Sequence, residues 1–127
     1  MTYVEALTGI DIESGRKLWQ SLCASDKFPF QGIFWLLKKS GIWHLLIASP
    51  RVDAVGPRKA YEELEEATHL LSTDLNQFLK VELISPKHPF YEGLQSVYGK
   101  NSVEGTRLSN TQIHGMYIDA AYLYEIR

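Results

Sequence analysis

The sequence predicts a single domain over residues 1–127 of the α/β or α+β class. We expect a mixed sheet of about five strands, with two or three helices packed against it. A chain of 127 residues with 45% hydrophobic and 22% charged residues is typical of one folded domain. Three features indicate this class: an apolar β-hairpin, a strand–helix–strand crossover and a second hairpin at the C-terminal end. The expected core comprises Trp19, Leu22, Phe34, Leu36, Leu45, Ile47, Tyr61, Leu64, Leu71, Val81, Leu83, Leu94, Tyr117 and Leu123.

The first expected elements are helical. Residues 2–5 have the spacing of a capping box, and Asp11 is expected to cap a helix over residues 12–24. Gly15 weakens this helix by up to about 1 kcal/mol relative to alanine, unless another element packs closely against it. Cys23 lies on the apolar stripe of the helix, where buried packing is expected. As the single cysteine it cannot form an intrachain disulfide.

The two segments Phe30–Leu37 and Ile42–Ala48 are apolar on both alternating faces, which is typical of strands inside a sheet covered on both sides. Lys38-Lys39-Ser40-Gly41 joins them, and its glycine is placed for the left-handed residue of a short turn. The segments are therefore predicted to form an antiparallel hairpin, with the two lysines in a solvated turn.

After the hairpin we expect a loop over residues 51–55 and then a helix entered at Gly56-Pro57, where the missing N–H of proline costs nothing. The apolar positions of this helix recur at helical spacing as far as Leu71, with charged residues on the other face. Phe78–Ile84 alternates as a strand with one wet face. A right-handed crossover makes this strand parallel to the one that ends at Ala48.

The remaining pattern predicts a helix over Pro89–Tyr98 and a C-terminal hairpin. The expected strands of this hairpin are Val103–Leu108 and Gln112–Ile126, joined by a turn at Ser109-Asn110. Because the second strand exceeds the usual length of about five or six residues, we expect a bulge near residues 119–121.

One phrase occurs twice in the chain. Ser49-Pro50-Arg51 ends one predicted strand, and Ser85-Pro86-Lys87 ends the next. Neighbouring parallel strands would bring both cations and two helix N-termini to one edge of the sheet, where open α/β sheets bind ligands and anions. The candidate binding residues, for a small anionic ligand or a nucleotide phosphate, are Ser49, Arg51, Asp53, Arg58, Ser85, Lys87 and His88.

The favoured interpretation of the phrase is structural: Ser-Pro ends a strand and prepares the entry to a helix. The chain carries neither of the glycine-rich phosphate-binding motifs. Asp53 also has two structural alternatives, which are to cap its helix or to pair with Arg51.

The sequence shows no evident catalytic constellation, which favours a non-catalytic role. A small hydrolase would have to use His114 with Asp119 or with His88, although strand alternation places His114 and Asp119 on opposite faces unless a bulge intervenes. The four histidines and one cysteine lack the spacing of metal ligands, so no metal or other cofactor is expected.

The charge and hydropathy of the chain indicate which classes of partner it is expected to have. A net charge of −2 disfavours a nucleic-acid partner, and no apolar run approaches the about 18 residues that span a bilayer. With its lone cysteine and no signal-like start, the chain is expected to be cytoplasmic. The aromatic stretch Met116–Tyr124 could form a surface for a protein partner or for self-association, although sheet core is the favoured interpretation.

Three functional hypotheses follow. The leading one is a small cytosolic, non-catalytic binding or interaction protein. The second is an anion or nucleotide-phosphate binder at the paired Ser-Pro junctions. The third is a small hydrolase that uses the histidines named above.

Two segments carry a resemblance to a known group. Trp43–Asp53 with the following Gly56-Pro57 and Ala60-Tyr61, and Gly115–Tyr124 near the end, are similar to stretches of small uncharacterised bacterial proteins. The resemblance covers most of the chain from about Phe30 onward. It implies a bacterial origin and a stand-alone domain, and it brings no activity, cofactor or site residue with it.

Overall fold

The computed structural model describes residues 6–67, 81–99 and 102–127. Its elements in chain order are α1 (Gly9–Ser25), β1 (Gly32–Leu37), β2 (Trp43–Ala48), α2 (Arg51–Val55), α3 (Pro57–Ala67), β3 (Val81–Ile84), α5 (Pro89–Tyr98), β4 (Thr106–Ile113) and β5 (Met116–Ile126). Three predicted features lie outside the described residues: the capping box at residues 2–5, the end of the helix over residues 68–71, and residues 78–80 of the strand predicted from Phe78.

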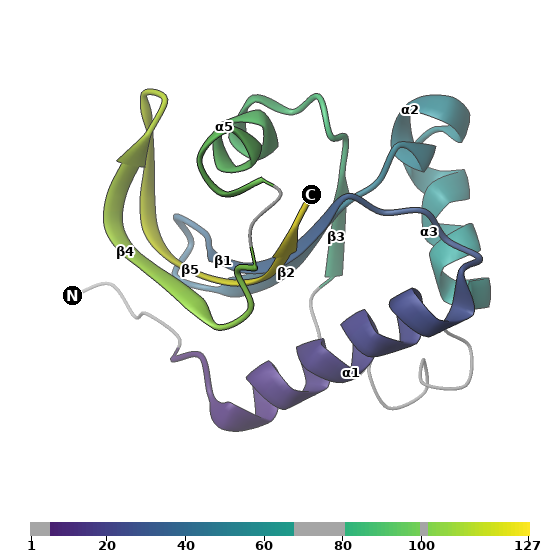
Figure 1. The fold of residues 1–127 in the computed structure, drawn as a ribbon, viewed down its shortest axis with the longest axis horizontal. Coiled ribbons are helices and arrows are strands. Elements are labelled where there is room, and N and C mark those ends of the chain that lie inside the picture. Colours follow the sequence, from purple (N-terminus) through teal and green to yellow (C-terminus); the bar gives the residue numbers. More distant parts are fainter. Residues whose placement is uncertain (1–5, 68–80, 100–101) are drawn as a thin grey trace.

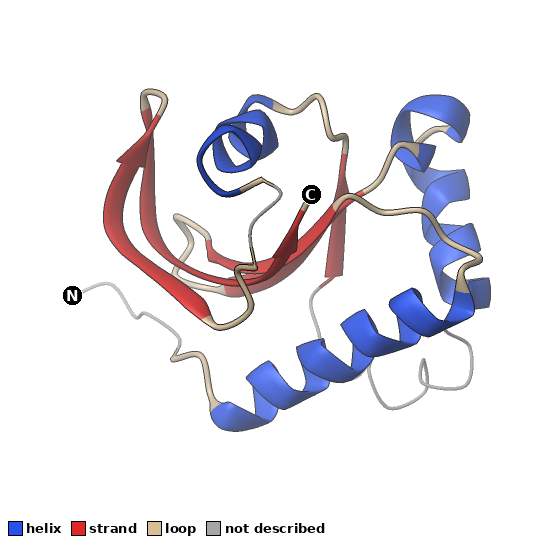
Figure 2. Ribbon diagram, viewed as in Figure 1, coloured by secondary structure: helices blue, strands red, loops and turns tan. Residues whose placement is uncertain are grey.

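The strands form one mixed sheet in the order β3-β2-β1-β5-β4, drawn in red in Figure 2. β1 pairs antiparallel with β2 and with β5, and β4 pairs antiparallel with β5. β2 and β3 are parallel, with Leu45 opposite Val81 and Ala48 opposite Ile84. The α+β class, the first hairpin and the parallel strand pair are therefore confirmed. Gly41 takes the expected left-handed conformation, with φ of 86°.

The two faces of the sheet are covered by different helices. α1 and α3 pack on the outer face, and α5 lies in the concavity of the inner face, where the sheet curves around it (Figure 1). The outer core includes Leu18, Leu22, Trp35, Leu45, Ile47, Ala60, Leu64, Leu83 and Tyr124. The inner core includes Phe34, Leu46, Ala48, Ile84, Tyr91, Leu94, Leu108, Ile118, Leu123 and Ile126.

Most of the predicted core is confirmed. Its buried members are Leu22, Phe34, Leu45, Ile47, Leu64, Leu83, Leu94 and Leu123. Those that lie half-buried against the core are Trp19, Leu36 and Val81.

Three side chains that were expected to be buried are exposed. Cys23 is exposed on α1, Tyr61 is 38% exposed and Tyr117 is 60% exposed. The Tyr61 hydroxyl accepts the Leu83 amide N–H over 2.9 Å and donates to the Val81 carbonyl oxygen over 3.2 Å. Tyr61 therefore occupies part of the open hydrogen-bonding edge of β3, which would otherwise be a template for another strand.

The helix boundaries differ from the prediction at two places. The N-cap of α1 is Thr8 and not Asp11, because the Thr8 hydroxyl accepts the Asp11 amide N–H over 3.1 Å and the Asp11 carboxylate accepts the Thr8 amide N–H over 3.0 Å. Residues 51–55 form the short helix α2 where a loop was predicted. Pro50 adopts a helical backbone conformation there, and its carbonyl oxygen accepts the Ala54 amide N–H.

Another element does pack closely against Gly15, which is the condition expected for a glycine within this helix. That element is the outer face of the sheet. A Cβ atom at Gly15 would lie 2.4 Å from the hydroxyl oxygen of Tyr124 and 2.8 Å from Nε1 of Trp35. These two groups are joined by a hydrogen bond of 2.9 Å, and the tyrosine hydroxyl in turn donates to the Ile12 carbonyl oxygen over 2.6 Å. Glycine is thus needed here for close approach of the helix and the sheet.

The turn of the C-terminal hairpin lies further along the chain than predicted. His114 and Gly115 form it with φ of 49° and 80°, the signs that a tight two-residue hairpin turn requires. Ser109-Asn110, the predicted turn, lies within β4 instead, although Asn110 has φ of 47°. The expected bulge near residues 119–121 is also misplaced. β5 changes register where Ile33 and Phe34 of β1 face Glu125 and Leu123, so the extra residue is Tyr124.

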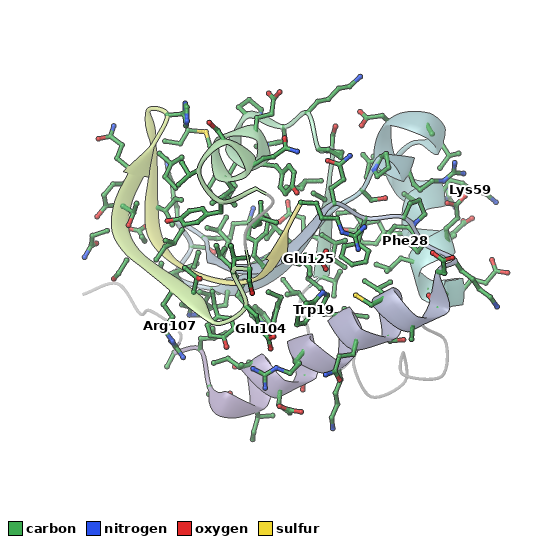
Figure 3. The ribbon with its side chains drawn as sticks, in the orientation of Figure 1. Trp19, Phe28, Lys59, Glu104, Arg107 and Glu125 are labelled. Carbon is green, nitrogen blue, oxygen red and sulfur yellow. The ribbon has the colours of Figure 1, made fainter. Side chains whose placement is uncertain are left out.

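The bulge has a structural consequence for α1. Because one residue is extra, Tyr124 and the next residue, Glu125, both face that helix. Glu125 accepts the indole N–H of Trp19 over 2.7 Å, and Figure 3 shows these two side chains meeting between α1 and β5. The bulge therefore provides two anchors for α1 from one strand.

Candidate functional site

The two Ser-Pro junctions lie side by side at the ends of the parallel strands. The Ser49 amide donates to the Ile84 carbonyl oxygen over 3.0 Å. In each junction the serine hydroxyl accepts the amide N–H two residues further on, which is that of Arg51 at 3.1 Å and that of Lys87 at 3.0 Å. The repeated phrase thus has a local cause, since each serine closes the turn that ends its strand.

Both serine hydroxyls also donate a hydrogen bond within the protein. Ser49 is fully buried and donates to the Pro29 carbonyl oxygen over 2.7 Å. Ser85 donates to the carboxylate of Asp53 over 2.7 Å, which ties α2 to the end of β3. In this arrangement both hydroxyl protons are donated to acceptors within the protein.

Of the cations at the junctions, Arg51 has a carboxylate partner in the protein. The Arg51 guanidinium pairs with Glu63 of α3 through two hydrogen bonds, Nε to Oε1 at 2.7 Å and Nη2 to Oε2 at 2.8 Å. These bonds hold the pKa of the Glu63 carboxyl below its usual value and raise the pKa of Arg51. Arg58 and Lys87 are exposed, and their side chains have no hydrogen bond or ion pair among the described residues.

The residues considered for hydrolysis come from three different places in the fold, although His88 and Asp119 line one pocket that is described below. His114 lies in the β4–β5 turn, Asp119 lies on β5, and His88 precedes α5. No hydrogen bond or ion pair links any two of them in the part of the chain that the structure describes.

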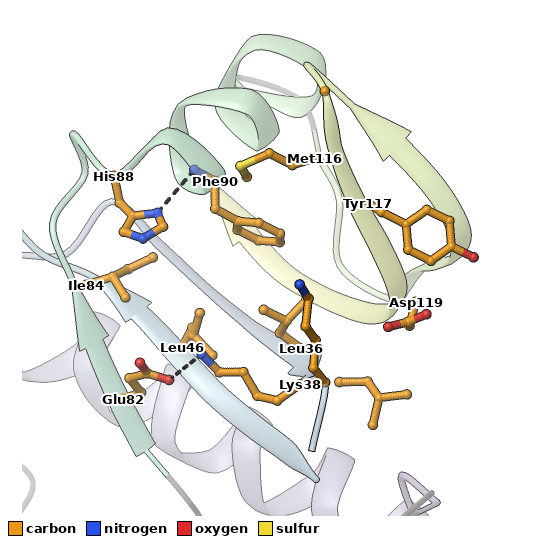
Figure 4. Close-up of a pocket in the computed structure, with 13 residues that line it drawn as sticks. Leu36, Lys38, Leu46, Glu82, Ile84, His88, Phe90, Met116, Tyr117 and Asp119 are labelled. Atoms are coloured by element: carbon orange, nitrogen blue, oxygen red, sulfur yellow. Dashed lines mark hydrogen bonds and ion pairs between the residues drawn. The ribbon is translucent and has the colours of Figure 1, made fainter. Parts of the chain in front are cut away.

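A pocket of about 480 Å³ lies on the inner face of the sheet beside α5. This volume is within the range of small-molecule sites. Figure 4 shows the pocket between the N-terminal end of α5, the strands β2 and β3, and the start of β5. Its apolar lining comprises Leu36, Leu37, Leu46, Ile84, Phe90 and Met116. Its polar lining comprises Lys38, Lys39, Glu82, His88, Tyr117 and Asp119.

The pocket is the part of the inner face that α5 leaves uncovered. Phe90, in the first turn of α5, stacks on Phe34 of β1 with ring centroids 5.8 Å apart. Leu36, two residues further along β1 and on the same face, is only partly buried and lines the pocket. The pocket therefore follows directly from where α5 begins.

One wall of the pocket is an ion-pair cluster. Lys38 Nζ lies 2.9 Å from Glu82 Oε2, and His44 Nδ1 lies 3.6 Å from the same oxygen. The Lys38 and Glu82 side chains are about one-third exposed, at 34% and 37%. Lys39 and Asp119 line the same pocket, and neither side chain has a hydrogen bond or ion pair among the described residues.

His88 forms another part of the polar lining. Its Nδ1 accepts the Phe90 amide N–H over 3.1 Å, which caps α5 and fixes the ring at the pocket (Figure 4). Since Nδ1 accepts, it carries no proton, and the neutral ring must hold its proton on Nε2. His88 can therefore donate one hydrogen bond from Nε2.

Of the seven candidate binding residues from the sequence, only His88 lines this pocket. Lys38 and Lys39 were interpreted as a solvated turn, yet both line it. Strand alternation could have placed Leu36 and Leu46 on one face. It could not show which part of that face the later helix covers.

The described ranges 6–67, 81–99 and 102–127 hold no group of three or more His, Cys, Asp or Glu residues that could bind a metal ion. They also hold no helix with the length and apolar content needed to cross a membrane. Comparison of the chain with models of known protein families, with curated proteins and with solved structures found no match.

Proposed function

We propose that this protein is a small, non-catalytic binding protein whose inner-face pocket holds the apolar part of a small molecule. The observation that carries the proposal is a cavity of about 480 Å³ in which partly buried Leu36, Phe90 and Met116 surround the buried side chains of Leu46 and Ile84. Covering such surface releases about 25 cal/mol per Å², so an apolar ligand of matching shape would be favoured there.

The polar lining supports a binding role for the pocket. A few polar groups around a mostly apolar cavity are the usual arrangement of small-molecule sites, where they orient the ligand. Lys39 and Nε2 of His88 are donors available for this purpose at the pocket.

The contacts give less support to an anion site at the Ser-Pro junctions. Arg51 is already paired with Glu63, and both serine hydroxyls are used in the turns. A cytoplasmic location and a bacterial origin remain part of the proposal, and fractionation of native cells tests the first of them.

The proposal is tested with a neutral probe, decanol, titrated into the full chain below its solubility limit. We expect saturable binding by calorimetry and a rise in the midpoint of thermal unfolding. A ligand at 100 times its Kd adds about 2.7 kcal/mol of stability. Met116→Trp should fill the pocket and weaken decanol binding at least tenfold.

The matched control is Val97→Trp, because Val97 is a 48% exposed residue of α5 that does not line the pocket. This variant should bind decanol as the natural chain does. The proposal is wrong if decanol does not bind, or if both variants weaken binding equally. Binding of a protein with an apolar side chain at the pocket, and of no small molecule, would point to an interaction module instead.

A further inference from the structure

We infer that the polar end of the ligand is an anion, such as a carboxylate, held at the β3 side of the pocket by Lys39, Lys38 and His88. This inference rests on the proposed function, since it names the chemical class of the molecule in the same pocket. The ligand would be an amphipathic monoanion with its apolar chain against Leu36, Leu46 and Met116.

The donors available at the pocket are the first argument. Lys38 and Lys39 carry two positive charges on adjacent residues, and only the Lys38 ammonium has an ion-pair partner among the described residues. Lys39 therefore brings a cation to the pocket that no carboxylate neutralises. His88 adds an N–H from Nε2, because Nδ1 is already an acceptor at the helix cap. A carboxylate can accept from several donors at once, and hydrogen bonds to a charged group are the strong ones.

The second argument is that Glu82 already has a cationic partner in the protein. Its Oε2 atom is buried and lies in contact with Lys38 Nζ at 2.9 Å, with His44 Nδ1 3.6 Å away. A cationic ligand at this wall would have to displace Lys38 from Glu82. An anionic ligand would not, since the Lys38 ammonium has three donor hydrogens and can bind a second acceptor beside Glu82.

The position of the other carboxylate is the third argument. Figure 4 shows Asp119 near Tyr117 on the β5 wall, across the pocket from His88 and Glu82. An anion near His88 would therefore be separated from Asp119 by the width of the pocket. The apolar chain of the ligand would fill the space between the two walls, over Leu36 and Leu46.

The experiment compares three probes that share one apolar chain: decanoate, decanol and decylammonium. All three are titrated into the natural chain at neutral pH and low salt, below the concentration at which they aggregate. We expect decanoate to bind about tenfold more tightly than decanol, which corresponds to about 1.4 kcal/mol, and decylammonium to bind more weakly than both. Inorganic phosphate, which has no apolar chain, should not bind measurably.

Variants then locate the anion. Lys39→Met keeps the length and the apolar stem of the side chain and should remove most of the preference for decanoate over decanol. Glu82→Gln releases Lys38 and should increase that preference. The matched control is Lys59→Met on the exposed face of α3, which should leave the preference unchanged.

The outcomes separate this inference from the proposed function. If decanol and decanoate bind equally, or if decylammonium binds best, the pocket is a binding site and the anion inference is wrong. If Lys39→Met and Lys59→Met reduce the preference equally, general charge attraction explains it, and the inference is again wrong. If none of the three probes binds, the proposed function itself fails.

Discussion

Replacing Gly15 by alanine tests how closely α1 must approach the sheet. A free helix would gain up to about 1 kcal/mol from this change. In this protein, however, the new Cβ atom would lie 2.4 Å from the Tyr124 hydroxyl oxygen and 2.8 Å from Nε1 of Trp35. Contacts under 3 Å cannot persist, so either the helix moves away or the two side chains shift.

The magnitude follows from two costs. Overpacking a well-filled core costs about 1–3 kcal/mol. A shift of the tyrosine also strains the hydrogen bonds of 2.9 Å from Trp35 and of 2.6 Å to the Ile12 carbonyl oxygen, and a buried polar group left without a partner costs about 1–3 kcal/mol. After subtracting the helix gain, we expect Gly15→Ala to lower the free energy of unfolding by about 1–5 kcal/mol.

The assay is equilibrium unfolding in urea, followed by far-UV circular dichroism. Gly9→Ala is the matched control, because a Cβ at Gly9 meets nothing within 4 Å, and its effect should stay within about 0.5 kcal/mol. The tyrosine contact is isolated by repeating Gly15→Ala in a Tyr124→Phe background, where the cost should fall by at least about 1 kcal/mol. If Gly15→Ala stabilises the protein, or costs the same in both backgrounds, the close-approach argument is refuted.

Two further predictions concern pH. The folded pKa of Glu63 is depressed by Arg51, so the stability that the pair contributes is present above the pKa of the unfolded chain and is lost as the pH falls through the folded value. Glu63→Gln should therefore destabilise the protein at neutral pH but not at acidic pH, and denaturant unfolding at several pH values checks this; an equal effect at every pH would contradict it. Burial raises the pKa of Tyr91 to about 12, so stability should be present below the unfolded value near 10 and decline as the pH rises towards 12. Tyr91→Phe removes the 2.7 Å bond to the Gln31 carbonyl oxygen and should cost about 1–2 kcal/mol at neutral pH while reducing the alkaline loss; an unchanged alkaline profile would show that this phenol is not the group responsible.

The elements that could be predicted from the sequence are those with a strong local signal. The hairpin of Phe30–Leu37 and Ile42–Ala48 was recognisable because both strands are apolar and Gly41 marks the turn. The helix Pro89–Tyr98 was predicted with its observed bounds, since proline begins it and Gly99 follows it. In these segments local preference and tertiary structure agree.

The errors arose where tertiary contacts decide between local alternatives. Ser109-Asn110 has typical turn residues, yet pairing with β5 keeps it inside a strand and leaves the turn to His114-Gly115. Tyr61 has the spacing of a core residue on α3, but α3 sits at the edge of the sheet, so its hydroxyl binds the β3 backbone instead. The spacing of apolar residues along one helix does not show which strand of the sheet that helix lies against.

The repeated Ser-Pro phrase has a structural explanation. Where two neighbouring parallel strands end at the same level, each chain must turn away from the sheet while its backbone N–H groups keep hydrogen-bond acceptors. Ser49 and Ser85 act in the same way here, because their hydroxyls accept the amide N–H groups of Arg51 and Lys87. The repetition in sequence thus reflects repeated geometry.

The pocket has a different origin, which is the width of the sheet. Five strands spaced about 4.8 Å apart span roughly 19 Å, whereas one helix with its side chains is about 10 Å wide. The outer face has two helices against it, α1 and α3, but the inner face has only α5 among the described elements. Because the sheet curves around α5, the helix covers more of the inner face than its own width. The part that it does not cover is the apolar surface beside Phe90. A second helix on that face would have given a closed core. Because the described elements supply none, part of this apolar surface is left for an external molecule to cover, and decanol binding that Met116→Trp weakens would support this account.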